Sequence, residues 1–301
     1  MVIQTPGKVT DRITLLGRRE SNVYYLDGGS EAVLLGGGMV YIAPDVMDQI
    51  REMELDTQKI RRIVILHAHF DHCGIVPFLQ KQWPGVSVAA SEAARAVLAK
   101  PKVVETIHGM NRAALERQNL LEKAGEMGFA DFPGIAVNEV LKEGQAVACG
   151  DRTIEILEVP GHSSCSIAAY VPEEKAMFAS DAGGIALGAD VFTAANSDFD
   201  KYQQSLEKMA AYDVEVCLSE HYGARTGEDG RNFLPRSWAA AAEFRQMMEQ
   251  SLARTNDPEQ TAAEITENVI SRSPSEFLPK EIVSMIIRQM AGDLDKKRAE
   301  T

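Results

Sequence analysis

The most informative stretch of the chain covers residues 63–72 and reads IVILHAHFDH. Its apolar first half has the composition of a buried strand, which ends where the histidines begin. Alternate side chains of an extended segment point the same way, so His67 and His69 can bind one cation. The turn that follows aims Asp71 and His72 at a second cation. Because the chain has only 6 histidines, this clustered pattern indicates a site for two metal ions.

Three further candidate ligands occupy similar positions later in the chain. They are His162, Asp181 and His221, and each follows closely on an apolar, strand-like run. Loops at the ends of strands are where a sheet scaffold presents its functional side chains. We therefore expect these three residues to join the His67–His72 motif in one metal centre.

Composition narrows the class of substrate. The chain has 301 residues, of which 45% are hydrophobic, and this is enough to bury a substantial core. Its 31 basic and 44 acidic residues give a net charge of -13, which opposes binding to the phosphate backbone of a nucleic acid. We expect a small-molecule substrate and no nucleic-acid partner.

The cysteines and the apolar runs bear on the cellular compartment. Cys73, Cys149, Cys165 and Cys217 show no paired spacing, so neither a disulfide framework nor a thiolate zinc site is expected. No apolar run reaches the roughly 18 residues that a membrane span needs, and no signal-peptide pattern opens the chain. These features predict a cytoplasmic protein with no membrane partner.

The order of elements predicts a mixed α/β fold. Short apolar runs predict strands over the ranges 13–16, 23–26, 32–35, 63–66, 153–159, 167–171, 176–179 and 214–218. Helices are expected over 44–53, from the N-cap Ser91 onwards, over 202–211, and over 239–253, 258–271 and 279–297. The stretch 223–235 has the composition of turns, and Gly36–Gly38 is interpreted as a strand-to-helix turn because no phosphate-loop motif follows it.

Domain organisation follows from this order. We predict a catalytic domain over residues 1–235 with a helical insert at about 91–127, and a helical cap over 236–301. In the last helix, Ile282, Val283, Ile286, Ile287 and Met290 recur at three- and four-residue spacing and form an apolar stripe. This stripe must be buried, and we expect it to close over the metal site as a lid; plain packing and a dimer interface are the alternatives.

The motif, followed in order by the later His, Asp and His, resembles the metallo-β-lactamase superfamily over about residues 10–225. This resemblance implies an αββα sandwich with the metal site at one edge of the sheets. By motif position, His67, His69 and His162 would hold one metal, Asp71, His72 and His221 the other, and Asp181 would bridge them. True β-lactamases of this fold lack an aspartate equivalent to Asp181, so the chain is similar to the other hydrolases of the superfamily.

A closer resemblance is to the PqsE-type quinolone-signal-response thioesterases. It rests on short matches at residues 71–74, 161–163, 103–105, 277–279 (Phe-Leu-Pro) and 284–285 (Ser-Met). This family implies helices that close the pocket. The loop over residues 183–197 has no match, so the substrate of that family does not transfer, and Ser219-Glu220 before His221 departs from the usual Pro-Gly.

The ligand set predicts hydrolytic chemistry. Nitrogen and oxygen ligands suit zinc, iron or manganese, and they do not distinguish among these metals. Two cations bridged by Asp181 and a solvent oxygen would make a hydroxide available near neutral pH, which attacks a carbonyl carbon. Asp71 is the candidate catalytic residue that orients this nucleophile and takes its proton. Because no dedicated general acid is evident, thioesters and esters are expected over amides.

Pocket residues and partners are harder to predict. His108 is either a packing histidine or a pocket contact, Tyr222 either packs at the rim or reaches the oxyanion, and Ser284 is a candidate pocket residue through the thioesterase resemblance. The expected partner is an acyl thioester or ester of small size, and a homodimer is left open.

Other function classes share this pattern. The same two metals could clamp a phosphodiester, which makes phosphodiesterase activity the enzymatic alternative, with lactonase activity a variant of the ester reaction. A di-iron redox protein usually resembles a His-x-Glu-x-Asp-His motif, whereas position 69 is histidine here. A regulatory binding protein with a relic site should have lost a ligand, and this chain retains the full set.

Overall fold

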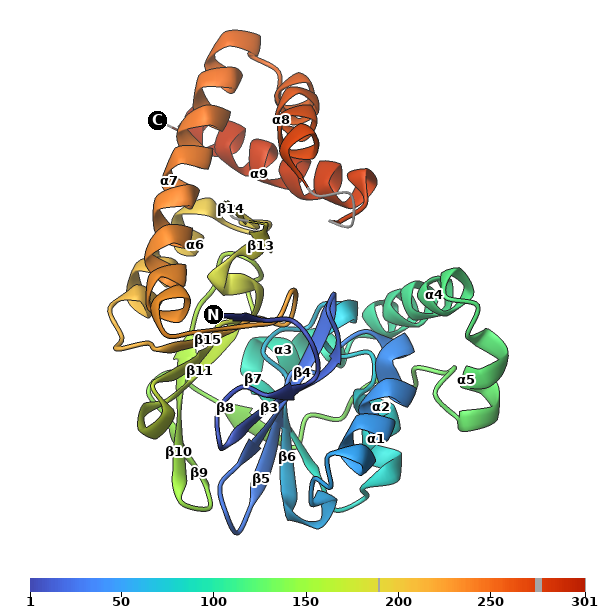
Figure 1. The fold of residues 1–301 in the computed structure, drawn as a ribbon. Coiled ribbons are helices and arrows are strands. Elements are labelled where there is room, and N and C mark those ends of the chain that lie inside the picture. The colour runs from blue at the N-terminus through green and yellow to red at the C-terminus, as the bar shows by residue number, and fades with distance from the viewer. Residues whose placement is uncertain (189, 274–277, 301) are drawn as a thin grey trace.

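The computed structural model describes residues 1–188, 190–273 and 278–300, and it contains two large β-sheets (Figure 1). Phe277, part of the Phe-Leu-Pro match, lies outside these residues. One sheet has the order β2 (Gly7–Lys8), β3 (Ile13–Arg18), β4 (Ser21–Asp27), β5 (Ala32–Leu35), β6 (Ile60–Val64), β7 (Ser87–Ser91), β8 (Glu139–Leu141). The other has the order β1 (Val2–Ile3), β16 (Ala224–Thr226), β15 (Val216–Leu218), β12 (Ala176–Phe178), β11 (Ile167–Val171), β10 (Arg152–Glu158), β9 (Ala146–Cys149). A separate hairpin joins β13 (Ile185–Leu187) to β14 (Asp190–Phe192).

Three layers of apolar side chains hold the sheets and helices together. Along β5, Val33 and Leu35 point into the core between the two sheets, whereas Ala32 and Leu34 point into the core beneath the helices. Successive strand residues face opposite sides, so a strand buried on both faces is continuously apolar, as residues 32–35 are. The αββα sandwich expected from the sequence is confirmed.

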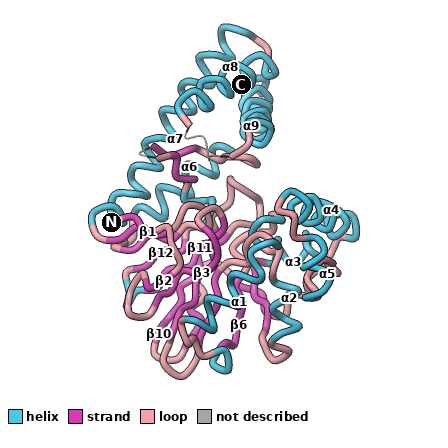
Figure 2. The backbone as a smooth tube through the Cα atoms, turned by 45° about the vertical axis from the view of Figure 1, so that its right-hand side comes forward, coloured by secondary structure: helices cyan, strands magenta, loops and turns pink. Residues whose placement is uncertain are grey.

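Helices cover both outer faces of the sandwich (Figures 1 and 2). The first sheet is covered by α1 (Ala43–Glu52), α2 (Val76–Gln82), α3 (Glu92–Leu98), α4 (Pro101–Arg117) and α5 (Leu121–Met127). The second is covered by α6 (Phe199–Ala210) and α7 (Glu228–Thr255), and α8 (Pro258–Arg272) and α9 (Lys280–Glu300) follow. The expected helical insert corresponds to α3, α4 and α5, and the Ser91 hydroxyl caps α3 by accepting a hydrogen bond from the Ala94 amide at 3.1 Å.

The expectation of a turn-rich stretch over residues 223–235 is wrong. Residues 224–226 form strand β16, and α7 already begins at Glu228, with Pro235 inside it. The glycine at position 230 does not mark a turn: a Cβ there would lie 2.1 Å from the Glu215 carbonyl oxygen, so close packing requires it. Residue 235, where we placed a domain boundary, consequently falls within one continuous helix.

The C-terminal helices form an extension above the sandwich (Figure 2). On α9 the predicted stripe is buried at Val283, Ile286, Ile287 and Met290, whereas Arg288 between them is exposed. The Lys297 ammonium joins α9 to the start of α6, with Nζ 2.8 Å from carboxylate oxygens of both Asp198 and Asp200. These contacts hold the extension on the sandwich.

Two further expectations concern the whole chain. All four cysteines are buried and free in the structure. Within the described ranges, no helix combines the length and apolar character that crossing a membrane requires.

Candidate metal centre

The predicted ligands meet because their strands end at one edge of the sandwich. Strands β10, β12 and β15 run in the same direction, since β10 and β12 both pair antiparallel with β11 and β12 pairs parallel with β15. Their carboxyl ends therefore deliver His162, Asp181 and His221 to a common edge. The segment after β6 brings His67 and His69 to the same place, where the Leu66 carbonyl of one sheet accepts a hydrogen bond from the Ile167 amide of the other.

A first cluster consists of three histidine nitrogens. His162 Nε2 lies 3.2 Å from His67 Nε2 and 3.0 Å from His69 Nδ1, and the last two atoms are 3.2 Å apart. Nitrogen ligands about 2.0–2.1 Å from a tetrahedral ion are about 3.4 Å from one another. The spacing of the three nitrogens therefore fits one metal ion.

A second cluster lies beside the first and includes a carboxylate. His72 Nε2 and His221 Nε2 are 3.1 Å apart, and each lies 3.4 Å from Asp71 Oδ2. Such a set of two imidazoles and one carboxylate suits a divalent ion of the first transition series or zinc.

Asp181 stands between the two clusters. Its Oδ2 atom lies 3.3 Å from His72 Nε2 in the second cluster and 3.5 Å from His162 Nε2 in the first. One carboxylate thus faces both clusters, as a bridging ligand would. Together, the structure brings all seven sequence-predicted ligands into one site.

Backbone carbonyls orient two of the histidines. The Nδ1 atom of His162 donates to the Ala194 carbonyl oxygen at 2.8 Å, and that of His221 donates to the Glu20 carbonyl oxygen at 2.7 Å. Each bond requires the proton on Nδ1, which leaves the Nε2 lone pair directed at its cluster.

Burial and neighbouring charges shift the pKa values of these groups in opposite directions in the two clusters. Burial, reinforced by His162, lowers the pKa of His69 to about 4, and burial together with His72 lowers that of His67 well below its usual value. Burial alone would raise the pKa of Asp71 and Asp181, but His72 and His221 outweigh it and hold both well below the ordinary range. The first cluster is therefore neutral and the carboxylates are ionised. In the second cluster Asp181 and its neighbouring carboxylates outweigh burial and raise the pKa of His72 and His221, so these two imidazoles must lose a proton to bind a metal ion.

Two residues outside the predicted set also contact the ligands. Glu220 Oε2 lies 3.0 Å from His72 Nδ1, and the Ser180 hydroxyl lies 3.3 Å from His67 Nδ1. Each directly precedes a predicted ligand in the chain, since Ser180 comes before the bridging aspartate and Glu220 before the last histidine. A carboxylate beside a ligand at the end of an apolar strand was the available signal for Glu220.

A cavity of about 520 Å³ opens above the two clusters. Its floor includes His69, Asp71, His162, Asp181 and His221. Its walls are largely apolar and come from α3, α4, the segment before α9, and α9, through Val97, Val103, Ile107, Met110, Leu278, Ile282, Met285 and Ile286. Two exposed lysines, Lys100 and Lys102, also line it.

The three predicted pocket residues lie near this cavity, but none is among the described residues that line it. On α9, Ser284 is flanked by Met285, which does line the cavity. His108 is half-buried and its Nδ1 accepts a hydrogen bond from the Phe132 amide at 3.2 Å, so it supports the loop after α5. Tyr222 is buried beside His221, with a backbone φ of 59°.

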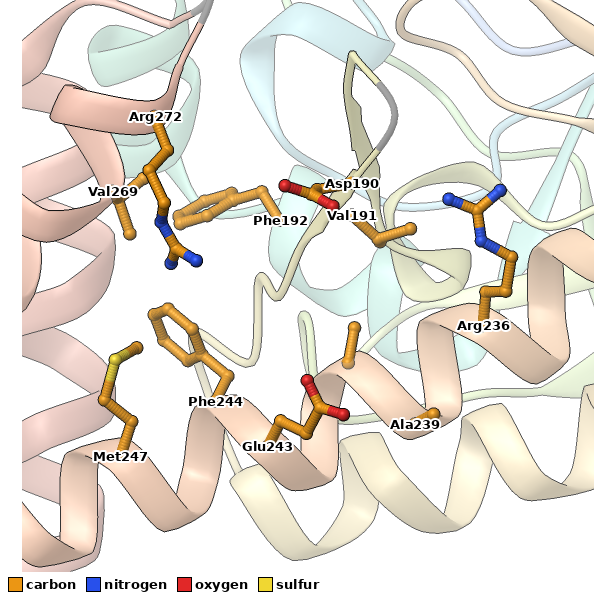
Figure 3. Close-up of a pocket in the computed structure, with 11 residues that line it drawn as sticks. Asp190, Val191, Phe192, Arg236, Ala239, Glu243, Phe244, Met247, Val269 and Arg272 are labelled. Carbon is orange, nitrogen blue, oxygen red and sulfur yellow. The ribbon is translucent and has the colours of Figure 1, made fainter.

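A second hollow, of about 340 Å³, lies between α7, α8 and β14 (Figure 3). Phe192 and Phe244 contribute aromatic rings whose centroids are 6.2 Å apart, and Arg236 and Arg272 lie on opposite sides of the view. The metal-centre residues are not among the described residues that line it, so it is separate from the metal centre.

Comparison with known protein families identifies the family of the chain. The model of the metallo-beta-lactamase superfamily matches residues 16–221, which is more than half of the chain and includes all of the predicted ligands. The chain belongs to the metallo-β-lactamase superfamily. Its expected family is thereby confirmed.

Curated relatives within the superfamily are hydrolases. The chain is 26% identical over 118 residues to the acyl-coenzyme A thioesterase MBLAC2 of Gallus gallus, covering 39% of this chain and 40% of that protein. It is 26% identical over 132 residues to the hydroxyacylglutathione hydrolase of Legionella pneumophila (strain Paris), covering 44% of this chain and 37% of that enzyme. The matches thus span less than half the length of either relative.

Solved structures show the same fold. The metallo-beta-lactamase family protein TTHA1429 from Thermus thermophilus superposes with a TM-score of 0.67 at 20% identity, covering 97% of this chain and 95% of that one. The subclass B3 metallo-beta-lactamase BJP-1 of Bradyrhizobium japonicum gives a TM-score of 0.56 at 19% identity, covering 82% and 95%. The helical extension is therefore included in the first of these likenesses.

Proposed function

We propose that the chain is a dinuclear metal-dependent hydrolase that cleaves thioesters or esters with an apolar acyl group. The observation that carries this proposal is the position of two adjacent ligand clusters on the floor of an apolar cavity. His67, His69 and His162 would hold one ion, and Asp71, His72 and His221 the other. Asp181 would bridge the two ions.

The ligand geometry indicates separate roles for the metal ions, for Asp71 and for the histidines. Two divalent ions, when bound, supply Lewis acids that lower the pKa of a water and polarise a carbonyl oxygen. Asp71 lies within 3.4 Å of both His72 and His221 and also lines the cavity, so it can orient the attacking water and accept its proton. His67, His69 and His162, whose pKa burial lowers, would bind one ion as neutral imidazoles, whereas His72 and His221 would each lose a proton on binding the other ion.

The cavity walls favour a particular kind of substrate. Side chains of α4 and α9 present apolar surface to anything bound over the floor, which stabilises a hydrocarbon or aromatic acyl group by about 25 cal/mol per Å² of area buried. Lys100 and Lys102 place positive charge at the same cavity in a chain with a net charge of -13. These two lysines suit a thioester whose thiol-containing carrier bears negatively charged groups.

The curated relatives support the same reaction class. One is named as an acyl-coenzyme A thioesterase and another as a hydroxyacylglutathione hydrolase. A thiolate leaves readily without help from a general acid, whereas an amine needs such help. Thioesters are therefore the first substrates to test.

The test is a substrate screen on protein reconstituted with zinc, iron or manganese. Acyl-coenzyme A thioesters of increasing chain length, p-nitrophenyl esters, a lactone and bis-p-nitrophenyl phosphate are compared at equal metal loading. Highest kcat/KM for the thioesters or esters is the expected result. Turnover of the phosphodiester alone would instead assign the site to phosphodiesterase chemistry.

A further inference from the structure

We propose that Glu220 is a positioning residue that supports both metal positions at once. It would do so directly through His72 and, by way of the Ser180 hydroxyl, through His67. This inference rests on the proposed function, because it assumes that the two ligand clusters hold ions.

The direct contact is to the second cluster. Glu220 is 2% exposed, and its Oε2 atom lies 3.0 Å from His72 Nδ1 on the side of the ring away from the cluster. A carboxylate behind a ligand imidazole fixes the orientation of the ring and makes it a stronger ligand. His72 thus has a carboxylate at ion-pair distance from a buried Nδ1 atom that makes no hydrogen bond to the described residues, whereas His221 in the same cluster donates to the neutral Glu20 carbonyl.

The indirect contact reaches the first cluster. Ser180 donates its hydroxyl hydrogen to Glu220 Oε2, and the hydroxyl oxygen lies 3.3 Å from His67 Nδ1, from which it can accept. The order of donors is therefore His67 to Ser180 to Glu220. Ser180 adopts a backbone φ of 48°, which a serine rarely takes, and this conformation lies directly before the bridging residue Asp181.

The surroundings leave space for the Glu220 carboxylate, and one of its two oxygens makes no hydrogen bond to the described residues. A Cβ at Gly36 would lie 2.5 Å from Glu220 Oε1, so only glycine leaves room for this oxygen. Within the described part of the chain, Oε1 has no hydrogen-bond partner. A buried anion of this kind needs nearby positive charge, which ions in the two clusters would provide.

One carboxylate consequently serves one histidine in each cluster. The remaining supports are separate: His162 relies on the Ala194 carbonyl and His221 on the Glu20 carbonyl. Removing the Glu220 charge should weaken both metal positions together, whereas removing the Ser180 hydroxyl should weaken the first position alone.

The experiment measures zinc affinity of the full chain by competition with a chromophoric chelator, and it uses cobalt absorption spectra to report each position. We expect Glu220→Gln to lower the affinity of both positions by about 10–100-fold. We expect Ser180→Ala to lower only the affinity of the His67 position. Glu174→Gln is the matched control, because this mostly buried carboxylate pairs with Arg152 and not with the predicted ligands.

The outcomes separate the two proposals. If the parent protein binds fewer than two ions, the proposed function fails. If the parent binds two ions and Glu220→Gln binds them with unchanged affinity and cobalt spectra, only the role of Glu220 is rejected. Should Glu220→Gln fail to fold, as judged by circular dichroism, Ser180→Ala decides, because the proposal requires a selective loss at the His67 position.

Discussion

The floor and the roof of the cavity are built in opposite ways. The floor consists of side chains from loops at strand ends, and the distances between neighbouring ligand atoms range from 3.0 Å (His162 to His69) to 3.7 Å (His221 to Asp181). The roof is the part of the apolar walls that α4 and α9 contribute, and its apolar side chains are spread along two helix faces. Changes to the floor should therefore abolish turnover, whereas changes to the roof should alter which substrate is preferred.

The largest effect is expected at the floor, for Asp71→Asn. The substitution keeps the volume but removes the charge that orients the nucleophile and accepts its proton, so kcat should fall by about 10³-fold. Steady-state kinetics on metal-loaded protein, with circular dichroism as the folding control, measure this. Full activity in a folded, metal-loaded variant would remove Asp71 from the mechanism.

Asp181→Asn should weaken the connection between the two halves of the floor. Without the bridging negative charge, two adjacent cations repel each other uncompensated, so one ion should be lost and kcat should fall by about 10²-fold. Elemental analysis after gel filtration gives the stoichiometry, with two ions expected for the parent protein. Retention of both ions by the variant would contradict the bridging role.

At the roof, Met285→Glu should change selectivity rather than chemistry. Met285 lines the cavity and is 45% exposed, so a charge is tolerated there but opposes an apolar acyl chain. We expect about a 10-fold loss in kcat/KM for long acyl substrates, or about 1.4 kcal/mol, and little change for acetyl substrates.

Ser284→Ala is the matched control on the same helix, because Ser284 is not among the described lining residues. Equal losses for long and short substrates in Met285→Glu would show that α9 acts as scaffold only. A selective effect of Ser284→Ala would instead restore Ser284 as a pocket residue.

The smallest effect is expected for Lys100→Ala combined with Lys102→Ala. Both side chains are exposed, so each ion pair with an anionic carrier stabilises binding by under about 1 kcal/mol. We expect roughly a 3- to 5-fold rise in KM for acyl-coenzyme A, on the order of 1 kcal/mol in total, that disappears at high salt. Uncharged esters serve as the control substrate, and a similar rise for them would contradict the electrostatic role.

Most of the fold could be predicted from local pattern. Strands such as residues 32–35 are apolar throughout because both faces are buried, and the stripe on α9 repeats at helical spacing because one face is buried. The start of α7 could not be predicted in this way. A glycine at position 230 is typical of a turn in a local sequence pattern. In the structure the glycine is required instead because α7 packs closely against the Glu215 carbonyl in the segment before β15.

The candidate site likewise has features that the local sequence predicts and features that only the folded structure decides. The seven proposed ligands could be predicted from the chain because each comes soon after a strand, and metal chemistry limits ligands to a few residue types that are rare in clusters. Other features depend on which surfaces meet after folding. These are the contact of Glu220 with His72, the face of α4 that lines the cavity, and the fact that Met285 rather than Ser284 lines it. Those contacts join residues far apart in sequence, such as Gly36 with Glu220, and no local pattern records them.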